Sequence, residues 1–377
     1  MPPISVSKII PVIAVGLILA ASIPVNWSFF RAEAVSSAPL DATFKRLAQG
    51  KITEELTTRY SASSPIKDLG IEAFGSLSYF VFHEARSQAQ IGQDGRLFSN
   101  EEFETGPTSL ATIDKAVAFI ADVDQHLKHQ NVALMIALLP LKADIDAASH
   151  VGNPLPKELS GRYNAVRDML VARGVKAVDL RKAFLWRNQQ ARLFLATDTH
   201  WSTAGAALAA DVISRAVSLP GIPCGKPYSL VQDAPVMRVG DLTRYVRLLP
   251  LLEHFGPKPE TLFPVRAEIG GAQASLTQAN SLSADDLFDS AVPPITLVGT
   301  SYSANPVFSF ESYLKVKLQC DVLNMAEEGK GPFAPMTTYL ASEGFRANPP
   351  KLVIWEIPIR YLDDDYPAEM FVLPDKR

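Results

Sequence analysis

The stretch Ile295-Thr-Leu-Val-Gly-Thr-Ser-Tyr-Ser303 decides the fold. Its first four residues carry no charge and predict a buried strand, Gly299 opens a turn, and a helix is expected from about Ala304 to Val316. In open α/β sheets, reactive groups lie just beyond the carboxyl ends of the strands. Ser301 has that position, which makes it a candidate nucleophile. The alternative, a plain serine cap of the following helix, stays open at this point.

Strands and helices alternate through the C-terminal two thirds of the chain. The run Asn131–Leu139 is apolar on both faces, as in a buried parallel strand. Further strands are predicted at 175–180, 321–325 and 352–355, and helices at 109–130, 157–173, 203–217 and 334–342. This alternation predicts a three-layer αβα fold, in which helices cover both faces of a parallel sheet.

Two segments break the alternation. Residues 226–292 contain proline, glycine and glutamine clusters without a sustained period, and we predict a small β-rich insertion there. Residues 31–105 predict a helical lead-in followed by a hairpin at 91–98, where Asp94-Gly95 suits a turn with positive φ. We therefore divide the chain into a signal segment (1–30), this lead-in with its hairpin (31–105) and the α/β domain with its insertion (106–377).

The N-terminus predicts export. An apolar run follows Lys8 from Ile9 to Val25, which is long for the core of a signal peptide and short for a spanning helix. The Ala-Glu-Ala at 32–34 suggests a cleaved signal, whereas the aromatic residues at 27, 29 and 30 favour a retained anchor. In either case Lys8 places the N-terminus in the cytoplasm, so we expect the body in the bacterial periplasm, anchored to the inner membrane if the segment is retained.

Composition and cysteine usage narrow the function further. The net charge is −4, and no basic run or zinc-finger spacing suggests nucleic-acid binding. His126 and His129 share a helix face, but no third ligand follows at metal-binding spacing, and we expect neither metal nor cofactor. Cys224 and Cys320 could pair in an oxidising compartment or remain buried thiols, and the sequence leaves both open.

An acid and a histidine precede an alanine-rich helix in Asp198-Thr199-His200-Trp201. At i,i+2 in a turning segment, the carboxylate could hold Nδ1–H of His200 and leave Nε2 as a base. Taken alone, Asp198 could equally cap a turn and His200 could be a packed loop residue. Together with Ser301, the pair supplies the side chains that acyl transfer requires.

Two later segments offer groups that could bind a developing oxyanion or the substrate. The loop after the strand at 321–325 carries Gly329 and Gly331, whose backbone N–H groups could be oxyanion donors; an ordinary glycine turn is the alternative. The last strand leads to Arg360 and Tyr361, and the alternative for Arg360 is a surface ion pair with the acidic run 363–365. Tyr302, beside the nucleophile, belongs to the same set of candidates.

These motifs resemble the alginate O-acetyltransferase family of SGNH-hydrolase-like proteins, which are periplasmic and acetylate bacterial exopolysaccharides. The resemblance covers about residues 60–362. It rests on Asp198-Thr-His-Trp201, Gly299-Thr-Ser-Tyr-Ser303 and Trp355-Glu-Ile-Pro358, with Gly240-Asp-Leu242 and Gly95-Arg-Leu-Phe98 as shorter signatures. In the last of these the family usually has Trp where this chain has Arg96.

The resemblance implies roles for individual residues. Ser301 corresponds to the nucleophile, His200 to the base and Asp198 to the orienting acid; because the serine comes last in the chain, the fold is a permuted SGNH-like fold. The glycine loop takes the place of the usual oxyanion glycine, and Arg360 and Tyr361 stand where ordinary members have an asparagine. Because the sequence stops at Arg377, about fifteen residues beyond the last motif, it resembles the membrane-anchored branch that lacks a carbohydrate-binding module.

The expected function is transfer of acetyl groups to a bacterial exopolysaccharide such as alginate, through a serine acyl-enzyme. The resemblance also implies a membrane acyl-exporting partner, because acetyl-CoA is absent from the periplasm. An anionic polymer would prefer a basic groove, for which Arg238, Arg244 and Arg247 are candidates. The alternatives are an esterase that uses the same triad with water and a non-catalytic polysaccharide-binding assembly subunit.

Overall fold

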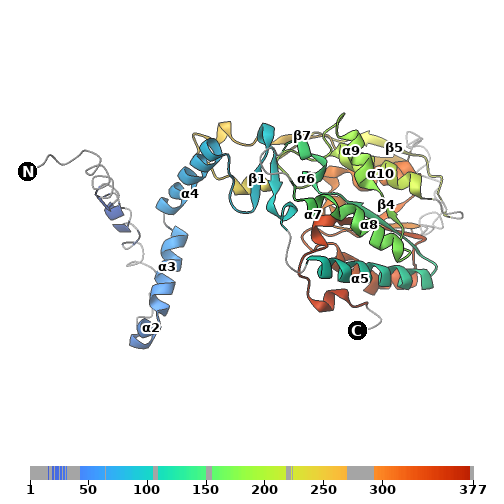
Figure 1. Cartoon of the computed structure of the whole chain (residues 1–377), viewed down its shortest axis with the longest axis horizontal. Helices are drawn as coiled ribbons and strands as arrows, with labels where there is room; N and C mark the ends of the chain where they lie inside the picture. Colours follow the sequence, from blue (N-terminus) through green and yellow to red (C-terminus); the bar gives the residue numbers. More distant parts are fainter. Residues whose placement is uncertain are drawn as a thin grey trace, which may run out of the picture. The chain divides into compact units, whose positions relative to one another are not determined.

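A computed structural model describes residues 43–63, 65–104, 109–149, 155–217, 222, 224–269 and 293–373, with scattered positions between 16 and 31 (Figure 1). It divides into two compact units, Met1–His83 with Arg247–Phe255, and Glu84–Val246 with Gly256–Arg377. Most of the predicted signal or anchor segment lies outside the described residues. Among the residues that are described, no helix combines the length and the apolar character needed to cross a bilayer.

The smaller unit is helical, as predicted for the lead-in. It contains α2 (Phe44–Ala48), α3 (Lys51–Ser63) and α4 (Pro65–Leu77), and α4 continues into a π-helical turn, η1 (Ser78–Phe82). The segment 247–255 packs directly on α4: the N–H of Leu249 donates to Ser76 Oγ at 2.9 Å. A Cβ on Gly75 would lie 2.0 Å from the carbonyl oxygen of Arg247, so only glycine allows this close approach.

The larger unit is built on a five-stranded parallel sheet. Its strands are β3 (Ala133–Leu139), β4 (Ala177–Val178), β9 (Ile295–Val298), β10 (Val322–Asn324) and β11 (Leu352–Pro358). They are ordered β10-β9-β11-β3-β4, and every neighbouring pair is parallel. The carboxyl ends of all five strands therefore lie at one edge of the sheet, where the site is found.

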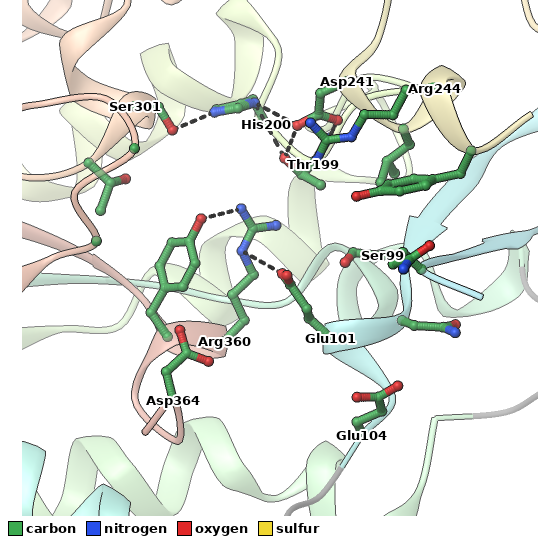
Figure 2. A pocket seen from close by; sticks show the side chains of 18 of the residues that line it. Ser99, Glu101, Glu104, Thr199, His200, Asp241, Arg244, Ser301, Arg360 and Asp364 are labelled. Carbon is green, nitrogen blue, oxygen red and sulfur yellow. Dashed lines mark hydrogen bonds and ion pairs between the residues drawn. The ribbon is translucent and has the colours of Figure 1, made fainter. Parts of the chain in front are cut away.

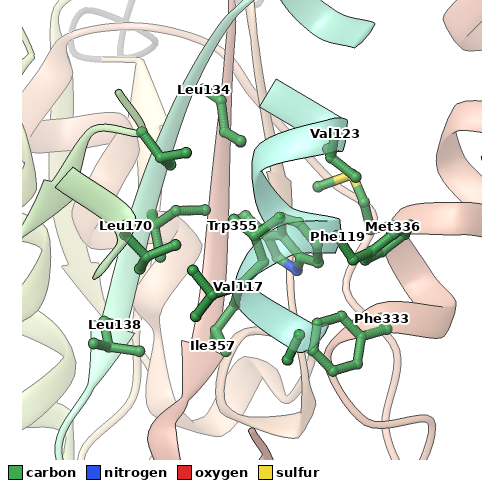
Figure 3. Packing of buried hydrophobic residues seen from close by; sticks show 14 of the residues in the cluster. Val117, Phe119, Val123, Leu134, Leu138, Leu170, Phe333, Met336, Trp355 and Ile357 are labelled. Atoms are coloured by element: carbon green, nitrogen blue, oxygen red, sulfur yellow. The ribbon is translucent and has the colours of Figure 1, made fainter. Parts of the chain in front are cut away.

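Both faces of the sheet are buried. Successive side chains of β3 point to opposite faces: Leu134, Ile136 and Leu138 join one apolar cluster, and Met135, Ala137 and Leu139 join the other. The first cluster includes α5 (Ser109–His129), α8 (Arg162–Ala172) and α14 (Phe333–Ala341), where Phe119 and Phe333 meet Trp355 edge-on (Figure 3). The second includes α9 (Leu180–Arg187), α10 (Thr203–Ala216) and α13 (Phe310–Leu318). The predicted αβα fold is confirmed.

The helix predicted after Ser301 is broken into three pieces. These are α12 (Ser301–Ala304), a 3-10 turn η7 (Pro306–Phe308) and α13. Pro306 has no N–H to continue the first helix, and Asn305 instead accepts a hydrogen bond from the N–H of Val307 at 3.1 Å. Similarly, the helix predicted at 157–173 consists of α7 (Lys157–Ser160) and α8, and it ends at Gly174 with φ +77°.

The hairpin belongs to the larger unit, and so does the insertion apart from its segment 247–255. β1 (Ala89–Ile91) pairs antiparallel with β2 (Leu97–Ser99), and both Asp94 and Gly95 have positive φ in the turn. The prediction grouped this hairpin with the lead-in, whereas the larger unit already begins at Glu84. The remaining predicted domain limits stay a prediction.

In the described part of the insertion, two antiparallel pairs form. β5 (Tyr228–Gln232) pairs with β8 (Val265–Ile269), and β6 (Val236–Arg238) pairs with β7 (Glu260–Leu262). Residues 270–292 of the predicted insertion lie outside the described residues. Cys224, just before β5, forms a disulfide with Cys320 at the end of α13, which resolves the alternative that the sequence left open.

Candidate active site

Ser301 begins α12, three residues after β9 ends. The turn that presents it is fixed by the buried carboxyl group of Glu356 on β11, which accepts hydrogen bonds from Thr300 N at 2.8 Å and from Ser303 Oγ at 3.0 Å. A Cβ on Gly299 would lie 2.6 Å from Glu356 Oε2, so the turn can approach the carboxyl group only because residue 299 is glycine. Burial raises the pKa of Glu356 to about 7, against the opposing effect of these hydrogen bonds.

A continuous chain of hydrogen bonds links Ser301, His200 and Asp198. Ser301 Oγ lies 2.7 Å from His200 Nε2, and His200 Nδ1 lies 2.6 Å from Asp198 Oδ1 (Figure 2 shows the serine–histidine contact). The N–H of His200 also donates to Asp198 Oδ1 at 2.9 Å. The arrangement joins residues 101 positions apart in the chain. An acid bonded to a histidine that is bonded to a serine is the order in which such groups activate a serine nucleophile.

The second oxygen of Asp198 is held by the insertion. Arg238 Nε donates to Asp198 Oδ2 at 2.7 Å, and the N–H of Asp241 donates to the same oxygen at 3.2 Å. Burial is the largest single influence and raises the pKa of Asp198, but the hydrogen bonds and charge of His200, together with Arg238, outweigh it. The net effect is a pKa below the usual range, so the fully buried carboxylate is ionised at neutral pH.

Lys142, which follows β3, is a further buried charge at the site. Its Nζ donates to three backbone carbonyls, those of Leu97 at 2.6 Å, Ala196 at 3.0 Å and Asp198 at 2.9 Å. These bonds use all three donors of the ammonium group and tie the hairpin to the Asp198 loop. Burial lowers the pKa of Lys142 to about 8.

Aromatic rings enclose the imidazole of His200. Phe308 stacks on it with centroids 5.1 Å apart, and Tyr302 packs at 4.6 Å. Tyr302 donates its hydroxyl to the carbonyl of Thr199 at 2.5 Å, and its side chain is buried. Tyr302 therefore contacts the base from the protein side and does not line the cavity, in contrast to its expected place among the oxyanion or substrate-binding groups.

A cavity of about 530 Å³ opens in front of Ser301 and His200 (Figure 2). Gly329 and Gly331, both with positive φ, line it together with Arg360 and Tyr361, so these four candidates lie around one opening. The lining also includes polar and charged side chains from the hairpin region, the insertion and the C-terminal part of the chain: Gln88, Ser99, Glu101, Glu104, Asp241, Arg244, Lys330 and Asp364.

Arg360 is a buried cation, with 6% of its surface exposed. Its Nη2 donates to Tyr361 Oη at 2.9 Å, whereas Nε and Nη1 find no hydrogen-bond partner among the described residues. Those two nitrogens lie 4.0 Å from carboxylate oxygens of Glu101 and Glu102. Among the described ion pairs, Arg360 faces Glu101 and Glu102, and Asp363 of the acidic run 363–365 pairs with Arg162.

The three arginines considered for a basic groove have separate environments. Arg238 contacts Asp198, as described above, and Arg244 lines the cavity, where its guanidinium lies 4.8 Å from the ring of Tyr245. Arg247 belongs to the smaller unit and lies 3.6 Å from Glu72. Of the three, only Arg244 lines the cavity.

The carboxylates of Asp198 and Asp241 and the ring of His200 lie within 4.8 Å of one another, and they are the grouping of metal-binding type in the described part of the chain. However, both oxygens of Asp198 already accept hydrogen bonds, one of them from the positively charged guanidinium of Arg238. This arrangement fits an acid–base pair better than a metal centre.

A parallel sheet with a serine after one strand and an acid–histidine pair before a helix defines an SGNH-hydrolase-like protein. Residues 89–359 match the family model described as "SGNH hydrolase-like domain, acetyltransferase AlgX". The chain belongs to this family, and the family resemblance noted in the sequence is confirmed.

Named relatives agree with this membership. A probable alginate O-acetylase AlgJ of Pseudomonas aeruginosa is 37% identical over 321 residues, which are 84% of this chain and 81% of the relative. A probable alginate O-acetylase AlgJ of Azotobacter vinelandii is 33% identical, over 94% of this chain and 89% of the relative. The solved O-acetyltransferase domain of Pseudomonas putida AlgJ superimposes with a TM-score of 0.65 and 30% identity, covering 74% of this chain and 94% of that domain.

Proposed function

We propose that this chain is an O-acetyltransferase that acetylates hydroxyl groups of alginate or a similar bacterial exopolysaccharide through an acetyl group carried on Ser301. The observation that carries the proposal is the hydrogen-bonded series Ser301–His200–Asp198, which opens into a cavity of sugar-accommodating size. The two relatives reported above are both named as probable alginate O-acetylases, which supports the choice of substrate.

The first half-reaction forms the acyl-enzyme. His200 Nε2 takes the proton of Ser301 Oγ, and Oγ forms a bond to the carbonyl carbon of an acetyl ester donor. The bond from that carbon to the donor's alkoxide then breaks, and the leaving oxygen takes the proton from the imidazolium. Ionised Asp198 stabilises the imidazolium between the two steps and keeps Nε2 directed at the serine.

The second half-reaction runs the same steps with a different alcohol. A sugar hydroxyl gives its proton to His200 Nε2 and attacks the acetyl carbon, and the bond to Ser301 Oγ breaks as Oγ recovers the proton. The outcome depends on whether a sugar or water occupies the cavity at this stage. Tyr245, Tyr361 and Tyr366 line the cavity and offer aromatic faces and hydroxyls for a sugar ring.

We propose the N–H groups of Ser301, Gly329 and Gly331 as donors to the oxyanion. The glycines line the cavity beside Ser301 and carry left-handed φ values of +70° and +64°. We assign Arg360 and Tyr361 to binding of the acceptor, because both residues line the cavity that also contains the nucleophile.

We also propose that the protein works in the bacterial periplasm, anchored to the inner membrane by its N-terminal segment beside an acyl-exporting membrane partner that supplies the acetyl group. The Cys224–Cys320 disulfide supports an oxidising compartment, since structural disulfides rarely persist in the cytosol. The apolar run 9–25 supports the anchor.

The test uses purified protein and 4-nitrophenyl acetate, with and without deacetylated alginate oligosaccharides. We expect release of nitrophenol, attachment of acetyl groups to the oligosaccharide detected by mass spectrometry, and loss of both in Ser301→Ala by at least about a thousandfold. Ser303→Ala is the matched control, because that hydroxyl contacts Glu356 behind the turn and not His200.

The other functions give different results. An esterase would release acetate at the same rate whether or not oligosaccharide is present and would leave the oligosaccharide unmodified. A non-catalytic assembly subunit would show no difference between the natural protein and Ser301→Ala in the acetylation of polymer by cells. Either result would overturn the proposal.

A further inference from the structure

We propose that Arg238 is a positioning residue that sets the strength of the catalytic base: it holds Asp198 against His200 and, by its charge, opposes protonation of the imidazole. The β-rich insertion would then take part in proton transfer, in addition to contributing residues to the lining of the cavity. The inference rests on the proposed function, because it concerns the activity of the same serine.

The loop 196–200, which carries both Asp198 and His200, needs this support because it lies outside the parallel sheet. The insertion supplies several of its backbone partners. Glu260 accepts hydrogen bonds from the N–H groups of Ala196 at 2.7 Å and Thr197 at 3.2 Å. The N–H of Leu242 donates to the carbonyl of Thr197 at 3.2 Å. We call Arg238, Asp241, Leu242 and Glu260 the loop clamp.

Within the loop clamp, Arg238 is the member that touches the acid itself through a charged side chain. Its Nε donates to Asp198 Oδ2 at 2.7 Å, on the opposite carboxylate oxygen from the one that faces His200. The guanidinium lies 5.0 Å from the ring of Phe308, which in turn stacks on His200. Only 22% of the Arg238 side chain is exposed.

Other charged groups near the pair come from two further places. Asp241, on the turn η5 (Asp241–Tyr245), lies 3.6 Å from His200 Nδ1, and its carboxylate also accepts from Thr199 N and Oγ1 at 2.8 and 2.6 Å. Lys142 approaches from α6 (Lys142–Ile145) and donates to the carbonyl of Asp198. The imidazole of His200 thus faces two carboxylates, those of Asp198 and Asp241. The positive charge of Arg238 partly neutralises the carboxylate of Asp198, which is the one hydrogen-bonded to the imidazole.

The physical consequence has a definite sign. Two carboxylates stabilise the positive charge of the imidazolium, the form that cannot accept the serine proton. The guanidinium draws the charge of Asp198 toward itself and repels the imidazolium. Removing that charge should therefore extend the inactive, protonated form of the base to higher pH.

The experiment measures kcat/KM for 4-nitrophenyl acetate from pH 5 to 8 in the full chain and in Arg238→Gln. We expect the acid limb to move upward by about half to one pH unit, with kcat at pH 6.5 falling by at most about three- to tenfold and KM unchanged. Arg238→Lys keeps the charge, so its acid limb should stay close to the natural position. The matched control is Arg266→Gln, which removes the same charge from the exposed strand β8 of the same insertion.

The position of the acid limb does not depend on how much of the protein is correctly folded, so a loss of stability in Arg238→Gln leaves the test valid. An unmoved limb in Arg238→Gln, or an equal shift in Arg266→Gln, would overturn the inference. A raised KM with the limb in place would also overturn it and would make Arg238 a substrate contact. If the natural protein and Ser301→Ala are equally inactive, the proposed function fails first, and that outcome is recognisable before any Arg238 variant is compared.

Discussion

At the scale of single residues, the site contains two buried carboxyl groups with different protonation: Asp198 is ionised, and Glu356 is partly protonated near neutral pH. Asp198 has a lowered pKa because His200 and Arg238 surround its carboxylate, whereas burial raises the pKa of Glu356 to about 7. Glu356 holds the turn of Ser301 by accepting hydrogen bonds from Thr300 and Ser303. Near neutral pH, therefore, the nucleophile turn rests on a group that titrates.

Glu356 should make the stability of the natural protein fall as pH rises. Its folded-state pKa, about 7, exceeds the unfolded value near 4.5, so the native state binds the proton more tightly. The contribution is fully present below about pH 4.5 and is lost by about pH 7, with an upper size of about 3 kcal/mol. We expect Glu356→Gln, which does not titrate, to lack this fall. Urea unfolding at pH 5 and pH 8 measures it, and equal pH dependence in both proteins would contradict the assignment.

The residues with chemistry in their side chains were predictable, and those that position them were not. Ser301, His200 and Asp198 stand at strand ends or helix starts, where the sequence marks reactive groups. The sequence did not predict the positioning roles of Arg238 and Lys142, because each contacts the Asp198 loop across 40 to 56 positions of the chain. Asp241 belonged to a recognised short motif, but only the folded contact with Thr199 shows what its carboxylate does.

At the scale of elements, long apolar runs and caps predicted structure well, and short elements did not. Ser202, one residue before the predicted start of the helix at 203–217, caps α10 by accepting a hydrogen bond from the N–H of Gly205. The helix α9 was missed: it follows β4, which has two residues, so neither element is long enough to show its period. For the insertion, the sequence predicted that strands form but not which strands pair, because the paired residues are 22 to 41 positions apart.

The close approach of the insertion to the Asp198 loop gives a prediction at this scale. A Cβ on Gly240 would lie 2.1 Å from the carbonyl oxygen of Thr197, and the backbone of Gly240 has an ordinary φ of −65°. Gly240→Ala should therefore act through space alone, displacing the loop and lowering the free energy of unfolding by about 1–3 kcal/mol. Esterase activity should fall with it, because His200 and Asp198 move together.

Gly344→Ala is the control for this variant. The nearest atom to its added Cβ would be Ser342 Oγ at 3.9 Å, which is ordinary contact, and the residue lies in the helix α15 (Glu343–Ala347). We expect unchanged or slightly increased stability and full activity in this control. Unfolding curves and 4-nitrophenyl acetate hydrolysis compare the two variants. Natural activity and stability in Gly240→Ala would show that the loop yields without cost.

At the scale of the larger unit, one covalent link closes much of the chain. The Cys224–Cys320 disulfide joins positions separated by 96 residues, and the loop between them contains the insertion, β9 and Ser301. Backbone hydrogen bonds support the same junction, since the N–H groups of Gly225 and Lys226 donate to the carbonyl of Gln319 at 2.7 and 3.0 Å. The folded junction thus has two kinds of support, and the unfolded chain has only the disulfide.

Reduction should therefore destabilise the protein without disabling it. Opening a loop of this length frees the unfolded chain, so the free energy of unfolding should fall by about 2–4 kcal/mol in the presence of a phosphine reductant. Esterase activity at 25 °C should persist, because hydrogen bonds at Gln319 keep the insertion, and with it Arg238, in place. Urea unfolding and activity assays with and without reductant measure both effects.

A double variant, Cys224→Ser with Cys320→Ser, is the control: it should have the stability of the reduced protein, and reductant should not change that stability. If reduction instead abolished activity below the unfolding transition, the disulfide itself would be what holds the loop clamp against Asp198.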